Sequence, residues 1–160
     1  MRLDVKRSLL LAVSLRQREI EPIITSALTA AEAAGVPAFL SCIDIPPTDL
    51  AGTAQTVCRS GDDIWSGDLP DRLRYTERDQ LVIAGERFDG VLQLAGLGAL
   101  GEAWEVSLLI DVKNADWSTD LYLQRLLLAG ANPVTLEQVK LEWSLPAMGP
   151  PELGEPLFVD

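Results

Sequence analysis

The first 45 residues constrain the fold most, because they predict a strand, a helix and a second strand in succession. Residues 7–15 (RSLLLAVSL) form an apolar run of strand length. Apolar residues then recur at three- and four-residue spacing, which predicts a helix over about residues 17–34 with one apolar face. Residues 37–45 (PAFLSCIDI) predict a buried strand that stops at two prolines. Together these segments have the length of a βαβ unit, whose strands are parallel neighbours or are separated by a strand added later.

The later sequence favours antiparallel pairing. Residues 80–84 and 91–95 flank the segment GERFDG, which is typical of a hairpin turn, and residues 105–112 predict a further strand. A helix is expected over about residues 118–129. Residues 138–145 alternate strictly between apolar and polar side chains, which is typical of a strand with one wet face. We therefore predict an α+β fold with a mixed, mostly antiparallel sheet and two main helices.

The domain organisation follows from length and composition. A chain of 160 residues fits one core, so we expect a single α+β domain over residues 1–145. Residues 46–79 form an irregular excursion, which either contains a short helix near Leu69–Glu77 or serves a function of its own. Residues 146–160 contain four prolines and two glycines and predict an extended C-terminal tail.

Gly96, Gly98 and Gly101 match the dinucleotide-binding pattern G-x-G-x-x-G. Too few residues separate Gly101 from the next strand-like run to form the crossover helix that such a unit requires. We therefore interpret the match as a glycine-rich turn or bulge between two strands, and we expect no nucleotide cofactor.

The chain contains no histidine, which excludes Ser-His-Asp and Cys-His nucleophile arrangements and every zinc site that uses histidine. Cys42 and Cys58 form no C-x-x-C pair, so we expect free thiols, and a disulfide between them has no positive support in the sequence. The aspartates of residues 61–71 do not have the spacing of a calcium-binding loop. We expect neither a metal nor a cofactor.

The net charge of −11 is distributed unevenly, with −3 in residues 1–87 and −8 in residues 88–160. This acid excess argues against a nucleic-acid partner, because nucleic-acid phosphates attract basic proteins. No stretch approaches the length of a transmembrane helix, and the apolar run near the N-terminus lacks a signal-peptide cleavage site. We expect a cytoplasmic protein that does not contact membranes.

These exclusions favour a small acidic protein-interaction module without catalysis, namely an inhibitor, an immunity-type protein or an adaptor. Its partner would be a more basic protein, since charge complementarity speeds association. Trp65 lies in a polar loop and would be the contact anchor. The other expected contact residues are Asp62, Asp63, Asp68 and Trp117. A homo-oligomer is left open.

Two alternatives come from other functional classes. The first is a carboxylate-using enzyme or a small-ligand binder, in which Asp44 at the end of an apolar strand and Asp111 within residues 105–112 line one pocket. An arginine from residues 72–78 is a further candidate for this pocket. The second is a phage or secretion-apparatus assembly subunit, whose tail adds a strand to a neighbouring subunit. A structure separates the first alternative from the interaction module by showing whether these two carboxylates converge on one concave pocket or lie on flat, open surface.

Overall fold

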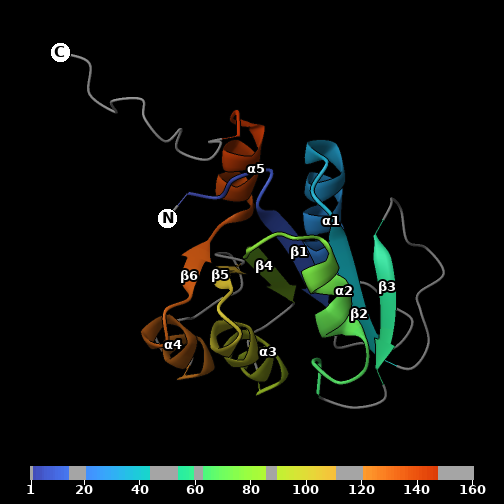
Figure 1. Cartoon of the computed structure of the whole chain (residues 1–160). Helices are drawn as coiled ribbons and strands as arrows, with labels where there is room; N and C mark the ends of the chain where they lie inside the picture. The colour runs from blue at the N-terminus through green and yellow to red at the C-terminus, as the bar shows by residue number, and fades with distance from the viewer. Residues whose placement is uncertain are drawn as a thin grey trace, which may run out of the picture.

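The structure is a computed structural model that describes residues 2–14, 21–43, 54–59, 63–85, 90–110 and 121–147. In these residues, six strands form one sheet in the order β3-β2-β1-β4-β5-β6 (Figure 1). Each pair of neighbouring strands in this sheet is parallel. The strands are β1 (Ser8–Val13), β2 (Ala38–Ile43), β3 (Gln55–Arg59), β4 (Gln80–Gly85), β5 (Glu105–Leu109) and β6 (Asn132–Val134).

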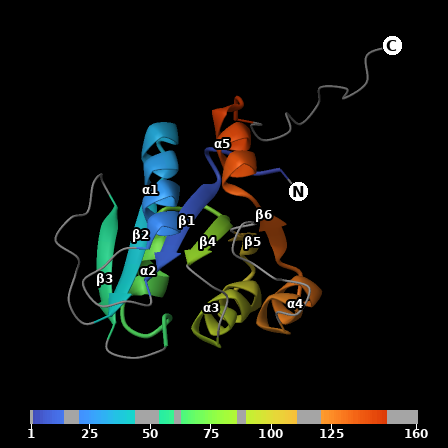
Figure 2. The same ribbon diagram turned by 180° about the vertical axis from the view of Figure 1, so that it is seen from behind.

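Helices cover both faces of the sheet. One face packs against two helices, α1 (Pro22–Ala34) and α5 (Leu136–Ser144). The other face packs against three helices, α2 (Leu69–Tyr75), α3 (Gly90–Gly101) and α4 (Leu121–Leu128). Figures 1 and 2 show from opposite sides that α1 lies near α5 and that α3 lies beside α4. The described part of the chain is thus a doubly wound α/β arrangement.

Strand β1 explains why the early prediction succeeded. Leu9 and Leu11 belong to the core beneath α2, α3 and α4, whereas Leu10 and Ala12 belong to the core beneath α1 and α5. A strand that is buried on both faces has a continuous apolar sequence, as residues 8–13 do. The predicted strands over residues 7–15 and 37–45 correspond to β1 and β2, and the helix between them is α1.

The predicted α+β class with a mixed, mostly antiparallel sheet is wrong, because the sheet is parallel and its strands alternate with helices. The expected hairpin does not form, because its second predicted strand is part of a helix. Residues 80–84 lie in β4, but residues 91–95 belong to α3. Apolar and small residues follow each other around α3 with few polar ones between them, so no polar face marks the segment as a helix.

The alternating residues 138–145 mostly form α5 instead of the predicted strand. Thr135 caps this helix, because its side-chain oxygen accepts a hydrogen bond from the backbone N–H of Gln138 at 3.2 Å. Val139 and Trp143 lie one turn apart and are buried, whereas Leu141 is 62% exposed. Apolar residues at every second position point in different directions around a helix, so only some of those in α5 reach the core.

The described residues of the expected excursion over residues 46–79 include β3 and α2. α2 lies at the position of the short helix that was expected near Leu69–Glu77 as one of two possibilities. Helix α4 falls within the expected helix over residues 118–129. Most of the predicted tail lies outside the described residues. None of the helices in the described ranges is long and apolar enough to cross a membrane.

The glycines of the G-x-G-x-x-G match lie within α3, so the expected turn or bulge is wrong as well. Gly96 allows α4 to approach, because a Cβ at this position would lie 2.5 Å from Cδ2 of Leu126. A Cβ on Gly98 would overlap the indole Nε1 of Trp65. These glycines therefore serve close packing of α3 against its neighbours.

Replacement of Gly98 by alanine should lower the free energy of unfolding by about 1–3 kcal/mol, because the added methyl group displaces a packed indole ring. The matched control is Gly101→Ala in the same helix, where a Cβ has no atom within 4 Å. Because glycine is a poor helix former, the control should raise stability by up to about 1 kcal/mol. Urea denaturation of both variants measures the difference, and equal effects would contradict the packing role of Gly98.

Candidate functional site

The order of the strands reverses at β1. The chain passes from β1 outward to β2 and β3, and then returns to β4 on the other side of β1. In open parallel sheets, ligands bind in the crevice beyond the carboxyl ends of the strands at such a reversal. Ser14 directly follows β1 at this edge, and Arg59 is the last residue of β3.

Four buried polar side chains gather at this edge, and we refer to Ser14, Glu21, Ser41 and Arg59 as the edge cluster. Their exposed fractions are 0%, 0%, 1% and 6%. Arg59 donates from Nη1 to Oγ of Ser41 at 2.8 Å and from Nη2 to the carbonyl oxygen of Ser14 at 2.8 Å. The hydroxyl of Ser14 donates to Oε2 of Glu21 at 3.2 Å. Ser14 thereby joins a buried carboxylate to a buried guanidinium.

The local structure explains how these residues meet. Glu21 is the N-cap residue of α1, and Pro22 suits the first turn of this helix. The parallel register places Arg59 beside Ile43 at the end of β2. Since β2 lies between β3 and β1, the long side chain of Arg59 spans β2 to reach Ser14.

The edge cluster has the components of acid-base chemistry. Burial of charged groups is costly unless hydrogen bonds compensate, so an arrangement of this kind is seldom kept without a structural or chemical role. A carboxylate that accepts a hydrogen bond from a hydroxyl is placed to take its proton. Arg59 adds a positive charge that is held at the backbone carbonyl of the same residue, and a fixed positive charge near a reacting group stabilises negative charge that develops there.

The carboxylates of the enzyme alternative, Asp44 and Asp111, lie outside the described residues, as do Asp62 and Trp117. In the sequence, Asp44 follows Ile43 at the end of β2, and Asp111 follows Ile110, which comes directly after β5. Whether the two carboxylates converge on one pocket therefore stays a prediction.

Trp65, Asp63 and Asp68 are described, and the structure gives each a local partner. Trp65 is half-buried, and its indole N–H donates to the carbonyl oxygen of Ala95 in α3 at 3.0 Å. Oδ1 of Asp63 accepts a hydrogen bond from the backbone N–H of Trp65 at 3.0 Å. Asp68 instead forms an ion pair with Arg72, one helical turn away, at 2.9 Å. Trp65 and Asp63 lie together, and their predicted role in a contact is untested.

Sequence reasoning missed the four residues of the edge cluster. Ser14 stands where an apolar strand ends, which is the signal that selected Asp44 and Asp111. Arg59 also ends a strand, β3, but that strand is not apolar. β3 itself was not predicted, because the segment QTVCR is short and half polar. The parallel register that brings Arg59 to β2 is not visible in the sequence.

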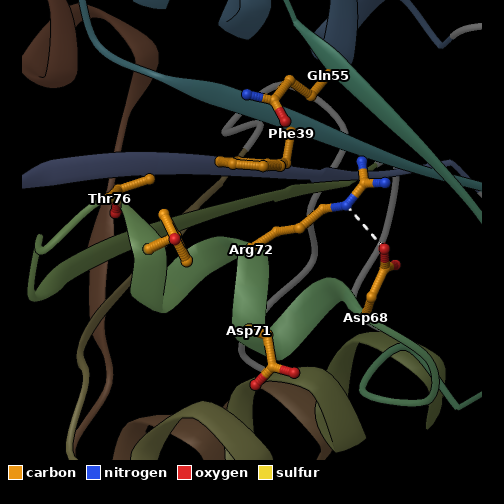
Figure 3. Close-up of a pocket in the computed structure, with 7 residues that line it drawn as sticks. Phe39, Gln55, Asp68, Asp71, Arg72 and Thr76 are labelled. Carbon is orange, nitrogen blue, oxygen red and sulfur yellow. Dashed lines mark hydrogen bonds and ion pairs between the residues drawn. The ribbon is translucent and has the colours of Figure 1, made fainter.

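A separate groove of about 510 Å³ lies between α2 and strands β2 and β3 (Figure 3). In Figure 3, Arg72 extends toward Asp68 and pairs with it, while Asp71 points away from Phe39. Two of the charged groups that line this groove, Asp68 and Arg72, are thus paired with each other. Its lining residues are Phe39, Gln55, Asp68, Asp71, Arg72, Tyr75 and Thr76. Within the described ranges, no group of three or more Cys, Asp or Glu side chains is placed to hold a metal ion.

No family model matches the sequence, and no curated protein matches it either. Solved structures do match the fold. YcaC from Pseudomonas aeruginosa is 24% identical with a TM-score of 0.70, over 88% of this chain and 82% of that one. The YcaC gene product from Escherichia coli, described as an octameric hydrolase of unknown specificity, is 21% identical with a TM-score of 0.70, over 88% and 81%. An isochorismatase family protein from Burkholderia thailandensis is 13% identical with a TM-score of 0.65, over 88% and 97%.

This likeness corrects the expected function. Proteins that are described as hydrolases share this fold, so the predicted non-catalytic interaction module, whether inhibitor, immunity-type protein or adaptor, is wrong. The enzyme alternative fits better, and nothing in the comparisons supports a basic protein partner or an assembly subunit of a phage or secretion apparatus. With its single parallel sheet between two layers of helices, the described chain has an isochorismatase-like α/β fold.

Proposed function

We propose that the chain is a hydrolase of a small molecule and that its site is the edge cluster. The observation that carries this proposal is the buried hydroxyl of Ser14, which donates to a carboxylate while the same residue accepts from a guanidinium. The position at the strand reversal supports it, because ligands of doubly wound sheets bind there. The likeness to a protein described as a hydrolase supports the reaction class.

The proposed chemistry assigns one role to each group. The Ser14 hydroxyl attacks the acyl carbon of a small ester or amide, and Glu21 takes the hydroxyl proton as the new bond forms. Arg59 stabilises the negative charge that develops beside Ser14, and the C–O or C–N bond then breaks as Glu21 passes the proton to the departing alcohol or amine. Water finally hydrolyses the acyl-serine ester, which releases the acid and restores the hydroxyl. Asp44 and Asp111 follow β2 and β5 in the sequence and are proposed to contribute further carboxylates.

A thiol nucleophile fits less well. Cys42 follows Ser41 in β2, and its Sγ atom lies 3.3 Å from that of Cys58. Burial, followed by a hydrogen bond with Cys58, raises the pKa of Cys42 to about 12. A thiol with this pKa stays protonated at neutral pH and is a weak nucleophile. The serine hydroxyl beside Glu21 is therefore the better candidate.

A panel of short-chain chromogenic esters and amides tests the proposed function. The wild-type chain should hydrolyse at least one compound, and Ser14→Ala should lower kcat/KM for that compound by about 100-fold or more. Circular dichroism should show an unchanged fold, since the substitution removes one oxygen. No hydrolysis above the buffer rate, or full activity in Ser14→Ala, would overturn the proposal.

A homo-oligomer is proposed as the working form, because large apolar side chains are exposed on neighbouring helices. Leu121 and Leu128 in α4 are 71% and 89% exposed, and Leu94 in α3 is 58% exposed. The octamer of the Escherichia coli protein supports an assembly of this kind. A cytoplasmic location stays a prediction.

The substitution Leu128→Glu should dissociate this oligomer, because it places a charge in the apolar contact. Size-exclusion chromatography with light scattering should show a lower mass for this variant than for the wild type. Leu141→Glu is the matched control, since Leu141 is 62% exposed on α5 in the opposite helical layer. A monomeric wild type, or dissociation by Leu141→Glu alone, would contradict the proposed contact.

A further inference from the structure

Cys42 and Cys58 form a thiol pair on two neighbouring strands. The two residues are register partners in β2 and β3, and their Sγ atoms lie 3.3 Å apart. We propose that this pair is an oxidation site, which a hydroperoxide converts into an intrachain disulfide. The inference is independent of the proposed hydrolase activity.

The backbone geometry suits a bridge between the two residues. Neighbouring strands lie about 4.8 Å apart, and disulfides join residues whose Cα atoms are about 4.4–6.8 Å apart. The two sulfur atoms already face each other, so they must approach by only about 1.3 Å to reach bonding distance. A side-chain rotation supplies such a movement, and the strand pairing is kept.

The two thiols differ in accessibility, which sets the order of the reaction. Cys58 is exposed, whereas Cys42 is buried with an exposed fraction of 2%. A hydroperoxide therefore reaches Cys58 first, because oxidation follows exposure. Burial raises the pKa of Cys42 to about 12, so this thiol stays protonated until Cys58 has reacted.

The chemistry balances in two steps. Hydrogen peroxide transfers one oxygen to the Cys58 thiol, which gives a sulfenic acid and one water molecule. The Cys42 sulfur then attacks the Cys58 sulfur, the S–O bond breaks, and the departing hydroxide takes the Cys42 proton to form a second water molecule. The two thiols together lose two electrons and two protons, and the peroxide is reduced.

The bond would fix the edge of the sheet. Among the described residues, β3 is the last strand on its side of the sheet, and it pairs with β2. A disulfide closes a loop between residues 16 positions apart, which should lower the unfolding equilibrium constant on the order of 100-fold. Ser41 precedes Cys42 and Arg59 follows Cys58, so the bond would also restrain these two residues of the edge cluster, which are hydrogen-bonded to each other.

The test treats the folded full-length chain with hydrogen peroxide, blocks remaining thiols by alkylation and measures the intact mass. We expect the mass of one chain that has lost two hydrogen atoms, with no covalent link between chains. Digestion should give a linked peptide pair that contains Cys42 and Cys58, and dithiothreitol should reverse the change fully. Urea denaturation of the oxidised chain should show the lower unfolding equilibrium constant.

Two single variants separate the roles of the thiols. In Cys42→Ser, no second thiol is present to form a disulfide with oxidised Cys58, so the Cys58 sulfur should gain two or three oxygen atoms. Cys58→Ser should resist the same treatment, because Cys42 is buried. Two results would overturn the proposal: wild-type Cys58 that gains oxygen atoms without a link to Cys42, or links that form only between two chains.

Discussion

Replacement of Arg59 by methionine should lower the free energy of unfolding by about 3–5 kcal/mol, the largest loss of stability expected from one polar substitution. The guanidinium is 6% exposed and donates to Ser41 and to the carbonyl oxygen of Ser14. Methionine keeps much of the apolar stem but leaves both acceptors buried without this donor, and each unsatisfied group costs about 1–3 kcal/mol. Urea denaturation at equilibrium measures the effect.

Arg72→Met provides the control for this prediction. Arg72 pairs with Asp68 across one turn of α2, and the two side chains are 44% and 61% exposed. Exposed pairs contribute little, so this substitution should change stability by less than about 1 kcal/mol. Equal losses for the two variants would mean that Arg59 is not held in a buried hydrogen-bond network.

Replacement of Glu21 by glutamine should lower kcat by about 100-fold or more on whichever substrate the ester and amide panel identifies. The amide oxygen of glutamine still accepts a hydrogen bond from the Ser14 hydroxyl, but the amide cannot take the proton. KM should change much less than kcat, since the proposed role of Glu21 arises during bond formation. Steady-state kinetics of the wild type and the variant give both values.

The control for Glu21→Gln is the same substitution at Glu102. Glu102 lies on the surface and pairs with Arg74, and both side chains are more than half exposed. Its replacement should leave kcat unchanged. An unchanged kcat in Glu21→Gln would remove the general base from the account, whereas a loss in both variants would point to the overall charge of the chain.

The sequence predicted the start of the fold well and the middle poorly, for physical reasons. β1, α1 and β2 have the period and length that their burial requires. α3 contains four glycines, and each glycine costs about 1 kcal/mol in a helix. Packing of Gly96 and Gly98 against Leu126 and Trp65 compensates for this cost, but such contacts join segments that are distant in the chain.

The candidate site was accessible to sequence reasoning only in part. The rule that polar residues at strand ends line a site led to Asp44 and Asp111, and it applies equally to Ser14. Glu21 lies in the first turn of the expected helix, where a negative charge is favourable, and nothing in the sequence assigns it to a site. Arg59 belongs to an unpredicted strand, and its side chain reaches Ser14 only because β3 lies parallel to β2 in one particular register.

The central claim is that the chain acts at the carboxyl edge of its parallel sheet. A crystal structure of the wild-type chain with the product of its best substrate tests this claim most directly. We predict that the product lies against the edge cluster, with an oxygen within hydrogen-bond distance of Ser14 or Arg59. A product bound instead in the groove beside Phe39 and Arg72, with the edge cluster still closed, would contradict the account.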